Sequence, residues 1–231
     1  MKVLLVWPPY QRLMGYPFIY YPVGISYISS TLRKAGHESF VYNMNVPAPG
    51  EPDLPREGSR KRFVALLDDD ASPVWQELRK VLRDLKPDMV GISTMTIFAA
   101  SARRISRIVK QELPQAWVVW GGPHPTSCAR EVLEGDSVEF CDRREGEETT
   151  LALVNALETG LRGDFSSIPG LSWRTPEGTC AHNPDRTLIK SLDDMPHPDK
   201  EIVVLREHYQ TSHFNNVFTA RGCPFKCNFC A

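Results

Sequence analysis

Three cysteines near the end of the chain have the spacing of a metal-cluster site. Cys223, Cys227 and Cys230 follow the pattern C-x3-C-x2-C, whereas the other three cysteines are isolated. Cysteine thiolates are the usual ligands of iron–sulfur clusters, and three thiolates this close can bind three corners of a 4Fe-4S cluster. The fourth iron would have no protein ligand. The spacing therefore predicts a cluster with one iron open to a small molecule.

A zinc site is the alternative for the same cysteines. Closed zinc sites have four protein ligands, typically in two separated pairs. The nearest spare ligands, His208 and His213, lie upstream and give no familiar zinc spacing. The chain also lacks the evenly spaced cysteines of secreted disulfide-rich proteins, so clustered thiols in a reducing compartment favour an iron–sulfur cluster.

Composition narrows the class of protein. Of 231 residues, 42% are hydrophobic and 24% are charged, which is typical of a globular protein with a buried core. The formal net charge of -1 and the scattered basic residues make nucleic acid an unexpected partner. The apolar run before Pro8 is too short for a signal peptide or a membrane span, so we expect a cytoplasmic protein without membrane contact.

The elements that must position a site alternate between strand and helix over the first 160 residues. Apolar runs of strand length lie at 3–7, 40–42, 89–92, 117–120 and, more weakly, 138–141. Segments with helical spacing lie at 25–32, 74–85, 105–113, 129–134 and 147–159. This alternation predicts an α/β fold: a doubly wound, five-stranded parallel sheet of the Rossmann-like or flavodoxin-like kind, forming a domain over residues 1–160.

The alternation of strands and helices does not continue after residue 160. Residues 168–174 and 179–181 predict two short strands joined by a turn, and a proline-rich linker follows, so we assign 161–212 to a β-hairpin and linker. Residues 216–219 predict a strand leading into the cysteines, at the start of a further unit over 213–231. Four prolines between positions 46 and 60 predict a surface loop, to which we assign no role.

Three loops meet at one edge of the predicted sheet. A doubly wound fold binds its ligand beyond the carboxyl ends of the strands. The third and fourth strands end there in small and polar residues, and the glycine pair at 121–122 would let a bulky planar ligand approach the backbone. A tight turn is the alternative for that pair. The third loop precedes a helix that starts with Glu147 and Glu148, for which helix capping is the alternative role.

The string from Arg221 to Cys230, with an aromatic residue before the last cysteine, resembles the signature loop of the radical S-adenosylmethionine (SAM) superfamily. The resemblance implies that Cys223, Cys227 and Cys230 bind a 4Fe-4S cluster whose open iron chelates SAM. One electron then cleaves SAM to methionine and a 5'-deoxyadenosyl radical. It also implies that Phe229 lies beside the adenine.

The strings at 22–27, 32–38, 90–93, 121–126 and 144–149 together resemble the N-terminal domain of cobalamin-binding radical SAM enzymes. The resemblance implies that the chain reaches only the first strand and loop of a partial TIM barrel, as a fragment of a longer reading frame. It implies cobalamin contacts at Ser93, Thr94, Met95, Thr96, Gly121, Gly122, Pro123, His124, Pro125, Thr126, Glu145, Gly146 and Glu147.

Many cobalamin carriers supply a histidine to cobalt from a D-x-H-x-x-G motif, and this string is absent here. His124 lies between two prolines, and we interpret it as a structural loop histidine, because a ligating imidazole normally needs a partner that holds it. We therefore expect cobalamin to be bound with its own base displaced from cobalt and with no histidine replacing it.

The resemblance implies a methyltransferase that acts on an unactivated carbon of a small molecule, through a 5'-deoxyadenosyl radical and methylcobalamin, with an electron donor of the flavodoxin or ferredoxin type. No catalytic residue is assigned within this chain. One alternative is a cobalamin radical SAM cyclase or rearrangement enzyme that does not methylate. Another is that this chain is a cobalamin-binding module without catalysis.

Overall fold

The centre of the molecule is a single mixed β-sheet. The computed structural model describes residues 1–15, 19–52, 54–55, 57–135, 137–223, 225 and 227–228. The strand order is β2-β1-β3-β4-β5-β6-β7. The strands are β1 (Lys2–Trp7), β2 (Glu38–Asn43), β3 (Met89–Ser93), β4 (Trp117–Gly121), β5 (Phe140–Asp142), β6 (Leu171–Arg174) and β7 (Cys180–His182). Strands β1 to β5 pair in parallel, and β6 and β7 add in antiparallel fashion.

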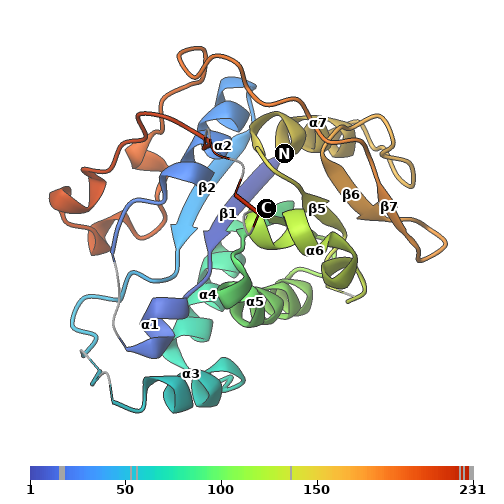
Figure 1. Cartoon of the computed structure of the whole chain (residues 1–231). Helices are drawn as coiled ribbons and strands as arrows, with labels where there is room; N and C mark the ends of the chain where they lie inside the picture. Colours follow the sequence, from blue (N-terminus) through green and yellow to red (C-terminus); the bar gives the residue numbers. More distant parts are fainter. Residues whose placement is uncertain are drawn as a thin grey trace.

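Helices cover both faces of this sheet (Figure 1). One face packs on α2 (Val23–Lys34) and α7 (Glu147–Glu158), and the other on α4 (Pro73–Leu85), α5 (Ala99–Glu112) and α6 (Pro123–Leu133). The shorter helices are α1 (Tyr10–Met14), α3 (Ser59–Leu67), η1 (Thr96–Phe98), η2 (Lys200–Ile202), η3 (Arg206–His208) and η4 (Thr211–Phe214). Within the described part of the chain, no helix has the length and apolar character that crossing a membrane requires.

Side-chain alternation explains why a parallel sheet forms here. In β1, Val3 and Leu5 pack with α2 and α7, whereas Leu4 and Val6 pack on the opposite side with α4 and α5. All four are buried, because successive side chains of a strand point to opposite faces and helices cover both. The continuous apolar run that predicted a buried strand is therefore explained by two separate cores.

The direction of winding changes between β1 and β3. From β1 the chain crosses to β2 on one side, and from β2 it crosses back past β1 to β3 on the other. At such a switch point the connections leave the sheet in opposite directions, which opens a crevice at the carboxyl ends of the two strands. This order matches the predicted flavodoxin-like winding of an α/β fold.

The five predicted parallel strands are present, but the sheet continues through β6 and β7 to seven strands, so its predicted size was wrong. The hairpin assigned to a connector pairs with β5, through Phe140 opposite Trp173 and Asp142 opposite Leu171. This pairing covers an edge of β5 that would otherwise expose its backbone groups. The predicted domain boundaries at residues 160 and 212 stay predictions.

Two other elements differ from the expectation. The described residues 216–219 are not in a strand, and the helix expected at 129–134 begins earlier, at Pro123.

The loop between β2 and α4 is tied to the core by a buried arginine. Arg12, 3% exposed, forms ion pairs with Glu51 of this loop at 2.5 Å and with Glu77 of α4 at 2.9 Å. The Tyr42 hydroxyl donates to the same Glu77 carboxylate at 2.5 Å. Burial disfavours the guanidinium charge, but the two carboxylates more than offset this and raise the pKa of Arg12. The loop is therefore anchored at one end.

Replacing Arg12 with methionine leaves two carboxylates without their cation in a largely buried site. We expect Arg12→Met to lower the free energy of unfolding by about 3 kcal/mol, the usual cost of breaking a buried ion pair from one side. Guanidinium denaturation followed by circular dichroism measures this change. The control is Lys80→Met, which removes an exposed ion pair with Asp84 on α4 and should cost much less. Equal losses in the two variants would contradict the proposed anchoring.

Candidate cofactor site

The sheet carries a cavity of about 900 Å³ at the carboxyl ends of its central strands. Its walls come from β1, β3, β4 and β5, from α2 and from the start of α7, and segments 188–190 and 218–222 border its mouth. The volume lies within the range of about 300–1,000 Å³ found for small-molecule sites. The cavity coincides with the winding switch point, where an open α/β sheet binds its ligand.

The floor of the cavity is apolar and extends between the sheet and two helices. Leu5, Gly91 and Val119 contribute from the interiors of β1, β3 and β4, and Ile25 and Ile28 contribute from α2. A Cβ atom at Gly91 would lie 2.7 Å from Leu5 Cδ2, so a larger residue there would force the Leu5 side chain to shift. The apolar residues of this floor suit a hydrophobic part of a ligand.

One wall is left open by a glycine at the start of α2. Gly24 lines the cavity, and a Cβ atom placed on it would meet no atom within 4 Å. A methyl group at this point would therefore lie in open space without striking the protein. Gly24 therefore helps to set the width of the cavity.

Backbone contacts hold the ends of β3 and β4 together at the mouth. Thr94 N–H donates to the Gly121 carbonyl at 2.8 Å, and His124 N–H donates to the Thr94 carbonyl at 3.0 Å. Gly122 has φ of +97°, and a Cβ atom there would lie 3.0 Å from the Thr94 carbonyl oxygen. This position therefore requires glycine, and the glycine pair does more than form a turn.

The predicted cobalamin contacts fall into two groups. Ser93, Gly121, Gly122, Glu145, Gly146 and Glu147 line the cavity. Thr94, Met95, Thr96, Pro123, His124, Pro125 and Thr126 do not. Thr94 is buried and its hydroxyl donates to the Ile92 carbonyl, whereas Met95 is exposed near the start of η1. Thr126 accepts from Arg144 N–H at 2.9 Å and so supports the neighbouring loop.

His124 lies inside the fold beside the Trp120 ring. It is buried, its Nδ1 lies 3.3 Å from Thr96 Oγ1, and its Nε2 has no partner among the described residues. Burial lowers the pKa of His124, so the neutral imidazole is favoured. This placement, away from the cavity, agrees with a structural histidine, which stays a prediction.

Asp142 is a cavity residue that the sequence did not reveal. It ends β5, is 3% exposed, and accepts a hydrogen bond at Oδ2 from the Thr150 hydroxyl at 2.6 Å. Its Oδ1 is buried and has no partner in the part of the chain that the structure describes. Burial raises the pKa of Asp142 to about 7. The only sequence signal was an acidic residue just after a weak strand.

The loop between β5 and α7 joins the cavity to the segment before the cysteines. Glu147, almost fully buried, forms an ion pair with Arg221 at 2.7 Å, and the Arg221 guanidinium lies 4.8 Å from the centre of the Tyr27 ring. Glu145 Oε2 accepts from Ile189 N–H at 2.7 Å. The start of α7 thus binds both segments that border the mouth, in addition to any helix-capping role.

The cysteine loop is only partly described. Cys223 and Cys227 are exposed, and Cys223 follows Arg221 by two residues. Cys230 and Phe229 lie outside the described residues, so their predicted roles as cluster ligand and adenine neighbour stay predictions. Within the described ranges, no group of three or more His, Cys, Asp or Glu side chains is positioned to hold a metal ion.

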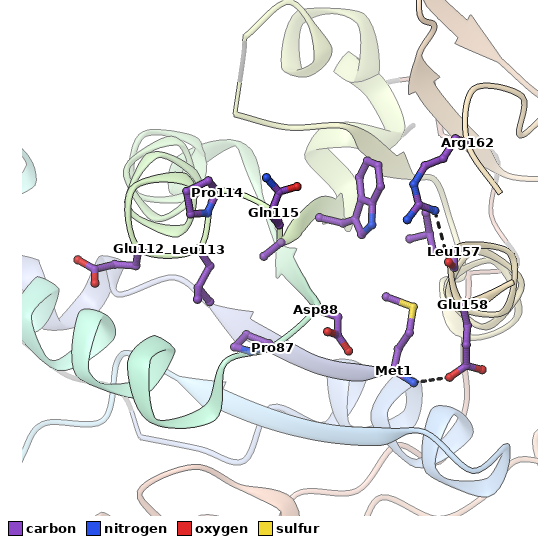
Figure 2. A pocket seen from close by; sticks show the side chains of 12 residues that line it. Met1, Pro87, Asp88, Glu112, Leu113, Pro114, Gln115, Leu157, Glu158 and Arg162 are labelled. Atoms are coloured by element: carbon purple, nitrogen blue, oxygen red, sulfur yellow. Dashed lines mark hydrogen bonds and ion pairs between the residues drawn. The ribbon is translucent and has the colours of Figure 1, made fainter. Parts of the chain in front are cut away.

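A second cavity of about 690 Å³ lies at the opposite, amino ends of the strands (Figure 2). Its charged groups already have partners: the Met1 amine pairs with Glu158 at 2.6 Å, and Asp88 accepts from Lys2 N–H at 2.7 Å. Glu112 pairs with Arg79 at 2.6 Å, outside the hollow. Among the described residues this cavity therefore has no charged group awaiting a ligand, and we assign no site to it.

Comparison with known proteins agrees with a cofactor site in the domain formed by the parallel strands. A family model described as the B12 binding domain matches residues 15–154. An uncharacterized methyltransferase from Pyrococcus horikoshii is 29% identical over 100% of this chain and 45% of its own length. An anaerobic magnesium-protoporphyrin IX monomethyl ester cyclase from Rubrivivax gelatinosus is 27% identical over 100% of this chain and 38% of its own. The chain thus spans less than half the length of these relatives.

A solved structure shares the fold. The radical S-adenosylmethionine methyltransferase TsrM from Kitasatospora setae, with cobalamin and a [4Fe-4S] cluster bound, has a TM-score of 0.54 and 22% identity, covering 85% of this chain and 31% of that one. The predicted relationship to cobalamin-binding radical SAM enzymes is confirmed. Matched over more than half of its length by the family model, this chain belongs to the B12-binding domain family.

Proposed function

We propose that the chain binds cobalamin in the cavity at the carboxyl ends of its strands, as part of a cobalamin-dependent radical SAM methyltransferase that acts on an unactivated carbon. The observation that carries the proposal is a cavity of about 900 Å³ at the switch point of a B12-binding domain. The substrate is a small molecule. The electrons come from a donor of the flavodoxin or ferredoxin type, and the enzyme works in the cytoplasm.

The residues of the cavity suit this ligand. The floor of Leu5, Gly91 and Val119 is apolar and can hold a flat ring system, and the glycines at the mouth allow close backbone approach. Ser93 and Asp142 offer a few polar groups among apolar ones, the usual pattern of a cofactor site. Bound cobalamin would supply a carrier for the methyl group, while the protein orients it and excludes water.

The cysteine loop supplies the second part of the proposal. Cys223, Cys227 and Cys230 would hold the 4Fe-4S cluster, and Phe229 would contact the adenine of SAM. A cluster that binds SAM supplies the 5'-deoxyadenosyl radical that activates the substrate carbon. The ion pair between Arg221 and Glu147 holds the segment just before Cys223 at the edge of the cavity.

A second candidate is a cyclase of the same architecture. The match to the cyclase from Rubrivivax gelatinosus over the whole of this chain favours it. The two functions differ in the mass of the product, because methyl transfer adds one methylene unit, whereas oxidative cyclisation removes hydrogen. Mass spectrometry of the product separates them.

The width of the cavity provides a test of cobalamin binding. We expect Gly24→Phe to weaken binding of hydroxocobalamin at least roughly tenfold, because the ring would occupy ligand space. Gly24→Ala adds only one methyl group and should bind nearly as well as the unmodified chain. Lys34→Phe, at the exposed end of the same helix, is the control for added hydrophobic surface. Binding is measured by visible absorbance titration, and full affinity in Gly24→Phe would exclude this cavity as the site.

The ion pair at the mouth provides a second test. We expect Glu147→Gln to increase hydrogen exchange of backbone amides in residues 217–223 about three- to tenfold, because the charged contact that docks this segment is lost. Exchange is followed by mass spectrometry. Glu148→Gln is the matched control, since Glu148 pairs instead with Arg186. An equal response in the two variants would show that Glu147 does not hold the segment.

The cysteine loop provides a third test. Anaerobic reconstitution of the intact enzyme should give about four irons per chain, and a serine at any of the three cysteines should remove most of them. Cys180→Ser serves as the control, because Cys180 lies on β7 away from the loop. Iron and zinc are measured together by mass spectrometry, and stable binding of zinc instead of iron would contradict the cluster.

A further inference from the structure

The carboxyl group of Asp142 is an incomplete hydrogen-bonding site on the wall of the cavity. The side chain is 3% exposed, yet no ion pair joins it to any described residue. Oδ2 accepts from the Thr150 hydroxyl at 2.6 Å, and Oδ1 is buried without a partner among the described residues. A buried polar atom of this kind costs folding free energy, and native proteins normally pair such atoms with protein, water or ligand.

The local backbone is arranged so that this carboxyl group fits. A Cβ atom at Gly146 would lie 2.9 Å from Asp142 Oδ2 and 3.0 Å from Ile28 Cδ1, so a larger residue at that position would displace one of these side chains. Thr150 lies one turn further along α7 and holds the carboxyl group by its hydroxyl. The position of Asp142 is thus set by two elements on its own side of the cavity.

The charged groups around Asp142 form ion pairs with other residues. Glu147 of α7 pairs with Arg221, and Arg143, next to Asp142, pairs with Asp185 at 2.7 Å. Arg186, from the segment after β7, pairs with Glu148 at 2.8 Å. The residues beside Asp142 on the two neighbouring strands are Gly121 and Leu171, and Ile28 of α2 lies close by. None of these three residues carries a charge. Burial therefore dominates and raises the pKa of Asp142 to about 7, which keeps much of the group protonated at neutral pH.

The surroundings select the kind of ligand group that can face Asp142. The amide groups at the rim of a corrin need polar partners on several sides, whereas the floor of the cavity is formed by apolar residues, among them Leu5, Val119, Ile25 and Ile28. An aromatic ring with one basic nitrogen fits an apolar slot that has one hydrogen-bond donor. Cobalamin has such a ring in its nucleotide base when this base is displaced from cobalt.

We propose that Asp142 binds the displaced nucleotide base of cobalamin, with the protonated carboxyl group donating one hydrogen bond to the basic ring nitrogen. This inference rests on the proposed function, because it assumes that cobalamin occupies the cavity. The bond satisfies the unpaired oxygen of Asp142, and it holds the nitrogen away from cobalt. Asp142 thereby discriminates complete cobalamin from corrinoids that lack the nucleotide.

The test compares hydroxocobalamin with cobinamide, which has the corrin but no nucleotide base, by absorbance titration of the chain. The measured quantity is the ratio of the two affinities. We expect Asp142→Leu to lower affinity for cobalamin roughly ten- to hundredfold at pH 6, the effect of losing a hydrogen bond from a buried group, and to leave cobinamide unchanged. Asp164→Asn, at an exposed aspartate, is the control and should change neither affinity.

The dependence on pH provides a readout that a merely structural role would not produce. The donor is present below the pKa of Asp142 and is lost above it, so the ratio in the unmodified chain should fall roughly tenfold between pH 6 and pH 8. Asp142→Asn keeps the volume and an N–H donor, so it should bind cobalamin at pH 6 with a ratio that no longer falls. Other charged groups should affect the affinities for cobalamin and cobinamide alike, so their pH effects cancel in the ratio of the two affinities.

Two results would overturn the inference while the proposed function stands. One is an equal loss of cobalamin and cobinamide in Asp142→Leu, which would mean that Asp142 contacts the corrin or supports the fold. The other is a ratio that falls with pH equally in the unmodified chain and in Asp142→Asn. If the unmodified chain binds neither corrinoid, the proposed function fails and the inference fails with it.

Discussion

The close approach of backbones at the ends of β3 and β4 is the constraint on which the rest of the site depends. Thr94 is hydrogen-bonded to Gly121 and His124 on either side of Gly122, and a side chain at Gly122 would strike the Thr94 carbonyl. These contacts fix the mouth of the cavity without using any side chain that would fill it. The position of the cavity itself follows from the change of winding at β1 and β3, where helices leave opposite faces of the sheet.

Below this mouth, two glycine residues shape the cavity. Gly24 and Gly91 line the cavity from different elements, and each has a different reason to be glycine. At Gly91 the neighbouring Leu5 side chain already fills the space, whereas at Gly24 the space is free. Because protein interiors normally pack to high density, a hollow of this size beside two hydrophobic cores is consistent with a resident ligand.

Buried charge concentrates at the edge of the cavity and at the anchored loop. Arg12 lies between two carboxylates, and Glu147 is buried against Arg221, so each charge has a partner of opposite sign. Asp142 has no such partner among the described residues, and burial raises its pKa. The difference separates charges that hold segments together from a buried carboxyl group that has no charged partner among the described residues.

Much of the fold could be predicted from local patterns. The buried strands and the helices at 25–32, 74–85 and 105–113 followed from apolar periodicity, which depends only on near neighbours. The meeting of the loops at 93–96, 121–126 and 145–147 followed from a general rule of parallel sheets. The cysteine spacing, and its resemblance to a signature loop, likewise came from a few adjacent residues.

The tertiary structure decided features that join distant parts of the chain. Strands β6 and β7 complete the sheet because the edge of β5 was free, and no local pattern reveals a free edge. The pairing of Arg221 with Glu147, the anchoring role of Arg12 and the isolated burial of Asp142 each depend on neighbours far away in sequence. The sequence by itself therefore determined the strands and helices of the parallel sheet and most of the loops that meet at its edge. Only packing in three dimensions decided which residues of those loops face the cavity and which charges remain without a partner.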